Sequence, residues 1–219
     1  MQVLPFGISG SFGSPAMRRT ALAASLAVWL GLAGVTHVVL TKYAFTPGPK
    51  ARSAPTWPDA AGLRHEPGKH SLVVFIHPRC PCSRATMTEL EELVAHHGPA
   101  VALSVVFITH PDAGLTIDPR SDPLWLRASA LRGATVLVDP DAKMASLFGA
   151  LTSGHSFLFG PDDRLEFEGG LTSARGHEGQ SAGSDAACAV LRGELPKLRS
   201  APVFGCELVE NEPPGSEPR

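Results

Sequence analysis

The sequence has no long block of basic residues. Its 19 lysine and arginine residues are offset by 21 acidic residues, which leaves a formal net charge of -2. Chains that bind nucleic acid usually carry a clustered basic surface, so we expect no nucleic-acid partner. Aromatic residues are also few, at 6%, but 43% of the 219 residues are hydrophobic, and most of the chain can bury a core.

Cysteine is scarce as well, with four residues in the chain. This number is too small for a miniprotein held together by disulfides. Cys80 and Cys82 lie close together, whereas Cys188 and Cys206 are isolated, and no second close pair completes a structural zinc site. The sequence also lacks a glycine-rich loop that would hold phosphates, so we expect no bound organic cofactor.

One apolar run dominates the N-terminal region. Residues 20–41 read TALAASLAVWLGLAGVTHVVLT and contain no formal charge, and about 20 such residues span a bilayer. Arg18 and Arg19 indicate that residues 1–19 form a cytoplasmic tail, although Lys42 follows the run. We expect an uncleaved single-pass transmembrane anchor; a cleaved signal peptide is the alternative, but the run is long for one.

Proline-rich segments flank the central region. Residues 42–61 contain four prolines, and we expect them to form an extended linker that holds a domain at residues 62–193 away from the membrane. Residues 194–219 are again rich in proline and should form a mostly irregular C-terminal tail. Val203 and Phe204 form a small apolar group in this tail and should dock onto the domain.

Apolar runs and helical periodicity alternate through the domain. Short β-branched runs predict buried strands, and apolar residues at helical spacing predict the helices between them. The expected order is strand, helix, strand, helix, strand, helix, hairpin and helix, at residues 71–76, 83–96, 101–109, 123–131, 134–138, 141–148, 156–159 with 164–168, and 184–192. This order predicts an α/β fold with a mixed β-sheet flanked by helices.

The turn after the first strand carries the candidate chemistry. Pro81 suits the first position of a helix, where its missing N–H costs no hydrogen bond, so Cys80 becomes the cap and Cys82 lies in the first turn. Unpaired N–H groups and the helix dipole stabilise a thiolate, which is the reactive form of cysteine. His77 and Arg79 are candidates to add positive charge to this site.

The segment VVFIHPRCPCSR, residues 73–84, resembles the active-site segment of thioredoxin-like proteins. It is most similar to the membrane-anchored periplasmic type related to TlpA and ResA, and to predicted bacterial proteins called RedB. The resemblance implies a thioredoxin-like fold and thiol–disulfide exchange with protein thiol or disulfide partners. It also implies a single-pass protein of the bacterial inner membrane, with the soluble domain in the periplasm. Cys80 is expected to attack as the thiolate and Cys82 to close the intramolecular disulfide, with Cys206 as a reserve resolving thiol.

This sequence departs from the family pattern in two places. Arg79 stands where the family has tryptophan, and if Cys80 matches the first family cysteine, the second position is Ser83. The family also has a cis-proline just before the hairpin, where this chain has Gly154 followed by His155. Loss of that proline can open space for a metal near the sulfurs.

The alternative function is therefore a copper or zinc binding or delivery protein that uses Cys80, Cys82 and His155, because thiolates and imidazole suit these metals. A peroxide-reducing enzyme is disfavoured, since His77 stands where such enzymes carry threonine or serine.

The sequence does not decide the role of two further regions. Three roles are open for Cys206: resolving a mixed disulfide, supplying a third metal ligand, or pairing with Cys188. Arg175 and His177 lie in a polar, glycine-rich loop and can stabilise a thiolate if that loop folds back over the thiol turn.

Overall fold

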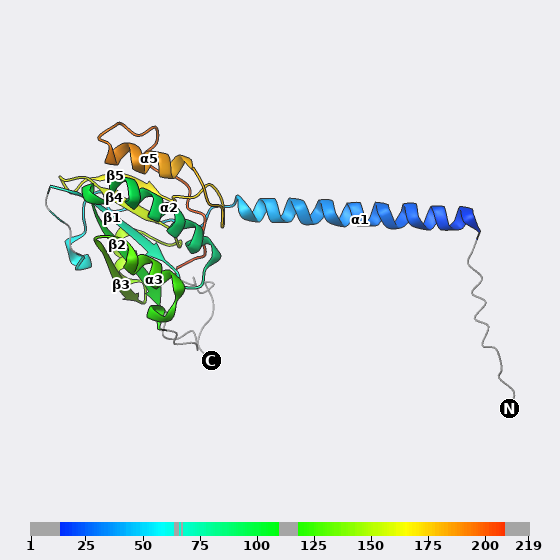
Figure 1. The fold of residues 1–219 in the computed structure, drawn as a ribbon, viewed down its shortest axis with the longest axis horizontal. Helices are drawn as coiled ribbons and strands as arrows, with labels where there is room; N and C mark the ends of the chain where they lie inside the picture. Colours follow the sequence, from blue (N-terminus) through cyan, green and yellow to red (C-terminus); the bar gives the residue numbers. More distant parts are fainter. Residues whose placement is uncertain (1–13, 64–65, 67, 110–117, 209–219) are drawn as a thin grey trace, which may run out of the picture. The chain divides into compact units, whose positions relative to one another are not determined.

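Helix α1 (Pro15–Ala44) contains the whole apolar run and extends beyond it at both ends. Its 30 residues give a length of about 45 Å, which exceeds the roughly 30 Å hydrocarbon core of a bilayer. Within the described part of the chain, it is the one helix long and apolar enough to cross a membrane. The computed structural model describes residues 14–63, 66, 68–109 and 118–208 (Figure 1). Of the tails expected at 1–19 and 194–219, residues 1–13 and 209–219 lie outside these ranges.

The chain divides into two units, Met1–Tyr43 and Ala44–Arg219, and the second contains a five-stranded sheet. The strands lie in the order β3-β2-β1-β4-β5 (Figure 1). Strands β1, β2 and β3 are parallel, whereas β4 is antiparallel to both β1 and β5. Their bounds are His70–Ile76 for β1, Val101–Thr109 for β2, Ala134–Pro140 for β3, Ser156–Phe159 for β4 and Leu165–Gly169 for β5. The mixed sheet predicted from the sequence is therefore confirmed.

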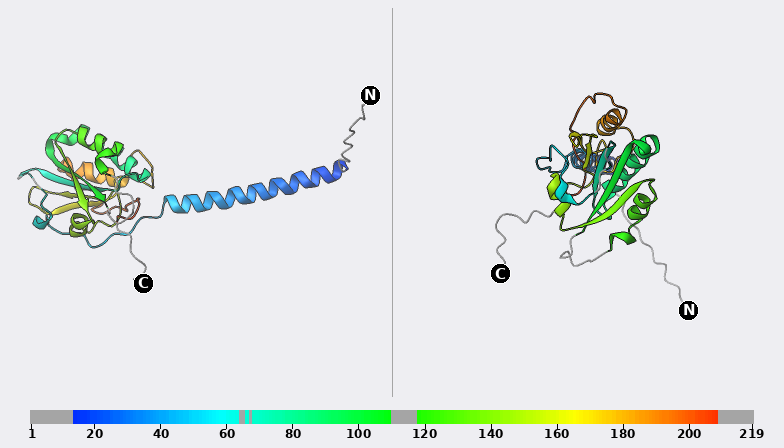
Figure 2. Two further views of the ribbon diagram at one scale, coloured as in Figure 1. Left: turned by 90° about the horizontal axis from the view of Figure 1, so that it is seen from below. Right: turned by 90° about the vertical axis from the view of Figure 1, so that its left-hand side faces the viewer.

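Helices cover both faces of the sheet. The α-helices described in this unit are α2 (Pro81–His97), α3 (Pro123–Ala130), α4 (Lys143–Phe148) and α5 (Ala182–Leu191), with short 3-10 helices at Asp59–Ala61, Gly98–Ala100 and Pro119–Ser121. Helices α2, α3 and α5 pack on one face, and α4 packs on the other (Figures 1 and 2). Helix α4 starts two residues later than the sequence predicts, because Asp141 and Ala142 both have positive φ angles, of 60° and 52°.

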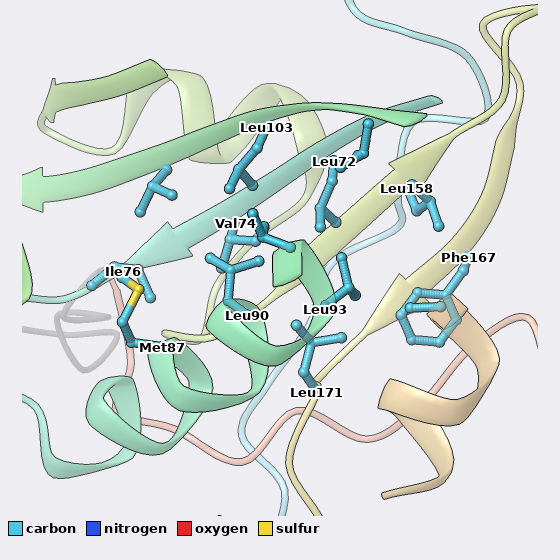
Figure 3. Packing of buried hydrophobic residues seen from close by; sticks show 14 of the residues in the cluster. Leu72, Val74, Ile76, Met87, Leu90, Leu93, Leu103, Leu158, Phe167 and Leu171 are labelled. Atoms are coloured by element: carbon cyan, nitrogen blue, oxygen red, sulfur yellow. The ribbon is translucent and has the colours of Figure 1, made fainter. Parts of the chain in front are cut away.

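Strand β1 supplies both cores because its side chains alternate between the faces. Leu72, Val74 and Ile76 enter the cluster beneath α2, α3 and α5 (Figure 3). Val73 and Phe75 enter the second cluster, which contains the phenylalanines of α4 and β4. This burial on both faces explains the continuous apolar run of the strand.

The segment 42–61, expected to be a linker, belongs largely to the domain. Trp57 is 7% exposed, and its ring packs edge-on against Phe148 and Phe159, with centroids 5.7 and 5.3 Å away. The backbone N–H of Gly48 donates to the carbonyl of Val203, at 2.8 Å. Residues 48–57 are therefore packed on the domain and do not form the extended linker that the sequence predicts, because proline removes only its own N–H and leaves neighbouring backbone groups able to pair.

The C-terminal tail also packs along the domain as far as it is described. Ser200 forms a parallel bridge with Glu168 of β5, and Ala201, Val203 and Leu208 are 4%, 2% and 0% exposed. The expected docking of Val203 is confirmed. The tail therefore forms part of the wall of the domain around the thiol turn.

Candidate active site

The thiol turn forms as the sequence predicts. Cys80 is the N-cap of α2, with extended backbone angles of φ -79° and ψ 125°, and Pro81 opens the helix. Cys82 lies in the first helical turn. The side chains of Cys80 and Cys82 are 3% and 6% exposed, so the site is screened from bulk water.

Arg79 acts through its backbone rather than through the charge expected of it. Its φ angle is 60°, a backbone conformation that residues other than glycine seldom adopt. Its N–H donates to Oδ2 of Asp122 at 3.0 Å, while Oδ1 of that carboxylate accepts from the N–H of Leu124 and caps α3. Asp122 thus holds the strained turn, whereas the side chain of Arg79 is exposed.

Cys80 contacts two further thiols. Its Sγ lies 2.7 Å from Sγ of Cys206, a residue 126 positions away in the sequence. The hydrogen bond donated by the Cys82 thiol is the largest cause that lowers the pKa of Cys80, from 9.0 to about 4. Burial opposes this shift, and donors from Cys206 and the backbone N–H of Ser83 add to it. Cys80 is therefore the thiolate of the cluster.

The other two thiols retain their protons. The hydrogen bond to Cys80 is the largest cause that raises the pKa of Cys82 above its ordinary value. Burial and the contact with Cys80 raise the pKa of Cys206 to about 11. The cluster thus holds one negative charge on Cys80 and two thiols that donate to it or lie against it.

Backbone pairing holds Cys206 in place. Its carbonyl accepts from the N–H of Ser153 at 2.8 Å, and Leu208 N–H donates to the carbonyl of Leu151 at 2.8 Å, with an antiparallel bridge between them. Gly205 permits this close approach, since a Cβ at this position would overlap the Ser153 carbonyl oxygen. The tail thus runs as a short strand beside the loop that precedes β4.

Arg175 supplies the positive charge near the sulfurs. Its backbone N–H donates to the carbonyl of Ala44, and its guanidinium donates to the carbonyl of Gly205. Its charge favours the ionised forms of Cys82 and Cys206, but it does not outweigh the causes that raise their pKa values. His177, the other candidate in this loop, is exposed.

Ser83 and Ser153 tie the thiol turn to the loop before β4. The sequence did not predict this role for either serine. Ser153 Oγ accepts from the N–H of His77 at 2.8 Å and lies 2.8 Å from Oγ of Ser83. Ser83 Oγ also donates to the carbonyl of His77 at 2.9 Å. Both serines are fully buried. His77 thus contributes its backbone, and Ser83, at the family's second cysteine position, has a bridging role.

Comparisons with known proteins give the fold. No protein-family model and no curated protein matches the sequence. An uncharacterised conserved protein from Geobacillus kaustophilus matches with a TM-score of 0.50 and 21% identity, over 75% of this chain and 92% of that chain. This likeness agrees with the fold that the sheet order describes. The domain has a thioredoxin-like fold.

Two other solved structures match the thioredoxin-like domain at lower TM-scores. A hypothetical protein from Sinorhizobium meliloti has 26% identity over 74% of this chain and 93% of its own, with a TM-score of 0.49. A secreted disulfide oxidoreductase from Mycobacterium tuberculosis, homologous to E. coli DsbE, has 16% identity over 57% of this chain and 82% of its own, with a TM-score of 0.40.

Gly154 occupies the expected position opposite the first turns of α2. Its φ angle is +88°, and a Cβ there would lie 2.6 Å from Oγ1 of Thr86. Its N–H donates to the carbonyl of Phe75 at 2.7 Å. Both the backbone conformation and the close approach of α2 thus favour glycine in this thioredoxin-like domain.

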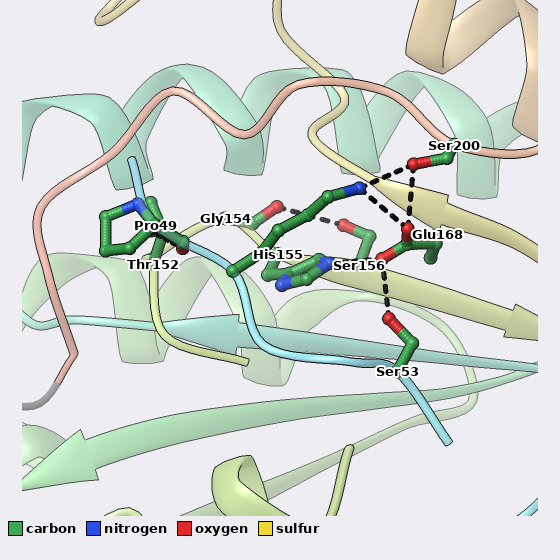
Figure 4. A network of polar contacts seen from close by, with 9 residues as sticks. Pro49, Ser53, Thr152, Gly154, His155, Ser156, Glu168 and Ser200 are labelled. Atoms are coloured by element: carbon green, nitrogen blue, oxygen red, sulfur yellow. Dashed lines mark hydrogen bonds and ion pairs between the residues drawn. The ribbon is translucent and has the colours of Figure 1, made fainter. Parts of the chain in front are cut away.

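The ring of His155 joins a polar network around Glu168 (Figure 4). The ring is buried, and Nε2 lies 3.1 Å from Oε2 of Glu168, which also accepts from Ser53 at 2.7 Å. Lys50 and Ser200 donate to the other carboxylate oxygen. Burial lowers the pKa of His155, so the ring is neutral at pH 7 and donates from Nε2.

This arrangement does not assemble the metal site that the sequence offered as an alternative. The ring of His155 is committed to Glu168 and not to Cys80 or Cys82. Across the described residues, no group of three or more His, Cys, Asp or Glu side chains is placed to hold a metal ion. The set of Cys80, Cys82 and His155 is therefore not assembled in this structure.

Replacing Glu168 with alanine should lower the free energy of unfolding by about 3 kcal/mol, because it leaves buried polar partners without their acceptor. The matched control is Glu166→Ala on the same strand, whose ion pair with His70 is partly exposed and should cost about 1 kcal/mol or less. Urea unfolding of both variants measures the difference. Equal losses would show that the Glu168 network adds no special stability.

Proposed function

We propose that this chain is a membrane-anchored thiol–disulfide oxidoreductase that acts on protein thiols or disulfides, with Cys80 as the nucleophile. The observation that carries the proposal is a buried cysteine at the N-terminus of α2, Cys80, whose sulfur lies 2.7 Å from that of a second cysteine, Cys206. A thiolate next to a thiol of the same chain is the pair that exchange requires, one sulfur to attack and one to release the partner.

The surroundings of Cys80 support nucleophilic attack. Cys80 receives hydrogen bonds from the thiols of Cys82 and Cys206 and from backbone N–H groups, which stabilise its charge before a partner arrives. Its thiolate attacks one sulfur of a partner disulfide, and the second partner sulfur leaves as a thiolate. The low pKa of Cys80 also makes it a good leaving group when the second thiol of the chain resolves the mixed disulfide.

The anchor and its orientation complete the proposal. Helix α1 would hold the protein in the bacterial inner membrane, and Arg18 and Arg19 before the span favour a cytoplasmic N-terminus and a periplasmic domain. The thiol turn resembles that of TlpA-, ResA- and RedB-type proteins, and their chemistry suits an oxidising compartment such as the periplasm. No organic cofactor is needed for this chemistry.

The test uses the full chain, reduced in detergent micelles, with a disulfide-bonded protein such as insulin as substrate. We expect a reversible dithiol–disulfide couple, and at least about a thousandfold slower exchange in Cys80→Ser, because a serine hydroxyl does not ionise at neutral pH. Cys188→Ser is the matched control and should keep full activity. Stoichiometric copper or zinc on the purified protein, without exchange activity, would instead favour the metal-binding alternative.

The reactivity of Cys80 should depend on pH in a distinctive way. Because its pKa is lowered to about 4 from 9.0, its alkylation by iodoacetamide should be constant from pH 6 to 8 and fall only below about pH 4. Alkylation of Cys188, whose pKa is raised by burial, should increase steadily over the same range. Mass spectrometry of the labelled peptides separates the two. A Cys80 profile that rises through pH 8 or 9 would contradict the assignment.

A further inference from the structure

We propose that Cys206 is the resolving thiol and that Cys82 stays reduced as the hydrogen-bond donor to Cys80. This inference rests on the proposed exchange function and reassigns the role that the sequence gives to Cys82. The active pair then joins the N-terminus of α2 to the C-terminal tail, instead of lying within a single turn.

The tail presents Cys206 to Cys80 at a fixed position. The two sulfurs are 2.7 Å apart, and backbone hydrogen bonds with Ser153 and Leu151 hold the tail at Cys206 itself and at Leu208, two residues further on. Gly205 packs against the carbonyl of Ser153, and the guanidinium of Arg175 binds the Gly205 carbonyl. Only a small movement is needed to join Cys80 and Cys206.

Cys82 is less well placed to form a bond with Cys80. The thiols of Cys80 and Cys82 share a hydrogen bond, but the ring of Pro81 fixes the backbone between them, and a disulfide across a single residue closes a small, strained ring. Ser83 is tied to the carbonyl of His77, which holds the first turn of α2 in place. A thiol that keeps its proton can still donate to Cys80 with this turn unchanged.

The charge of the cluster also favours attack by Cys80 first and resolution by Cys206 second. The contact with the Cys80 thiolate is one cause of the raised pKa of Cys206. Once Cys80 is joined to a partner sulfur, its negative charge is gone, and the remaining charge effect of Arg175 favours the Cys206 thiolate. Burial, the largest cause of the raised pKa of Cys206, remains, but formation of the mixed disulfide removes the charge of Cys80 that also keeps this thiol protonated.

The exchange balances as a two-electron transfer. Cys80 Sγ bonds to one partner sulfur, the partner S–S bond breaks, and the other partner sulfur leaves with the electron pair and takes a proton from water. Cys206 then loses its proton and attacks Cys80 Sγ, forming the Cys80–Cys206 disulfide and releasing the first partner sulfur as a thiolate, which is protonated. The partner disulfide is reduced to two thiols, and the chain is oxidised.

The test exposes the reduced full-length protein in detergent to oxidised glutathione, blocks free thiols by alkylation and maps disulfides by mass spectrometry. We expect a Cys80–Cys206 disulfide with alkylated Cys82 in the wild type, and the same disulfide in Cys82→Ser. In Cys206→Ser, glutathione should remain on Cys80 at least about tenfold longer, because no positioned thiol releases it. A Cys80–Cys82 disulfide with alkylated Cys206 would overturn the inference but leave the proposed function intact. Absence of any glutathione or disulfide at Cys80 in every variant would overturn both.

A second variant tests the tail without removing any sulfur. Gly205→Ala places a methyl group against the Ser153 carbonyl and should displace the tail, so that the mixed disulfide on Cys80 persists as it does in Cys206→Ser. Gly98→Ala is the matched control, because a Cβ there meets only an ordinary contact with Val94, at 3.4 Å. If Gly205→Ala resolves the mixed disulfide at the wild-type rate, backbone docking of the tail does not deliver Cys206.

Discussion

At pH 4 or below, where the Cys80 thiolate adds almost no stability to the reduced form, reduction of the oxidised protein should lower its free energy of unfolding by about 5 kcal/mol. A Cys80–Cys206 disulfide joins residues 126 positions apart, and a closed loop of this size removes about that much chain entropy from the unfolded state. A disulfide between Cys80 and Cys82 would close a very small loop and leave the unfolded chain almost unconstrained. The size of the change therefore reports which pair has formed.

Guanidinium unfolding of the full chain with and without a reductant measures this difference. Cys82→Ser should retain the difference, and Cys206→Ser should lose it almost entirely. Cys188→Ser provides the matched control, since Cys188 lies on α5 apart from the sulfur cluster. Equal stability of the oxidised and reduced wild type would argue against a disulfide between the domain and its tail.

Replacement of Cys82 with alanine should slow the reaction of Cys80 with iodoacetamide at pH 6 by about tenfold or more. The Cys82 thiol is the largest cause of the low pKa of Cys80, so its loss should raise that pKa towards 9.0. Each unit by which a pKa exceeds the solution pH reduces the thiolate fraction about tenfold. Above about pH 9 the order should reverse, because a thiolate of higher pKa is the stronger nucleophile.

Cys82→Ser is the matched variant, since its hydroxyl can still donate to Cys80 and should preserve much of the reactivity. Rates of iodoacetamide labelling, followed by mass spectrometry from pH 4 to pH 10, give the profile of each protein. A Cys82→Ala profile that overlays the wild type would show that Cys206 and the backbone N–H groups stabilise the Cys80 thiolate without Cys82.

The sequence predicts the fold well because its main signals are local. The apolar run of β1, the turn around Pro81 and the turn residues of the β4–β5 hairpin each specify an element from a few neighbouring residues. The linker could not be predicted in this way. Trp57 lies among prolines in the sequence, and only the assembled hydrophobic cluster around Phe148 and Phe159 shows that it belongs to the core.

The site is predictable in part for the same reason. The capping role of Cys80 follows from Pro81, and the sequence identifies Arg175 and Cys206 as candidates. Their meeting depends on backbone pairing between a loop and an irregular tail, which side-chain patterns do not encode. The bridging roles of Ser83 and Ser153 follow from the same long-range packing, and no sequence spacing reveals them.

The docking of residues 48–57 on the domain has a practical consequence for biochemical work. The helix that precedes this segment ends at Ala44, and the carbonyl of Ala44 already accepts from the N–H of Arg175. A water-soluble version cut at residue 60 would lose Trp57 from the core, together with Lys50 and Ser53, two of the donors to Glu168. A cut immediately before Ala44 would preserve all of these contacts and remove only the apolar helix.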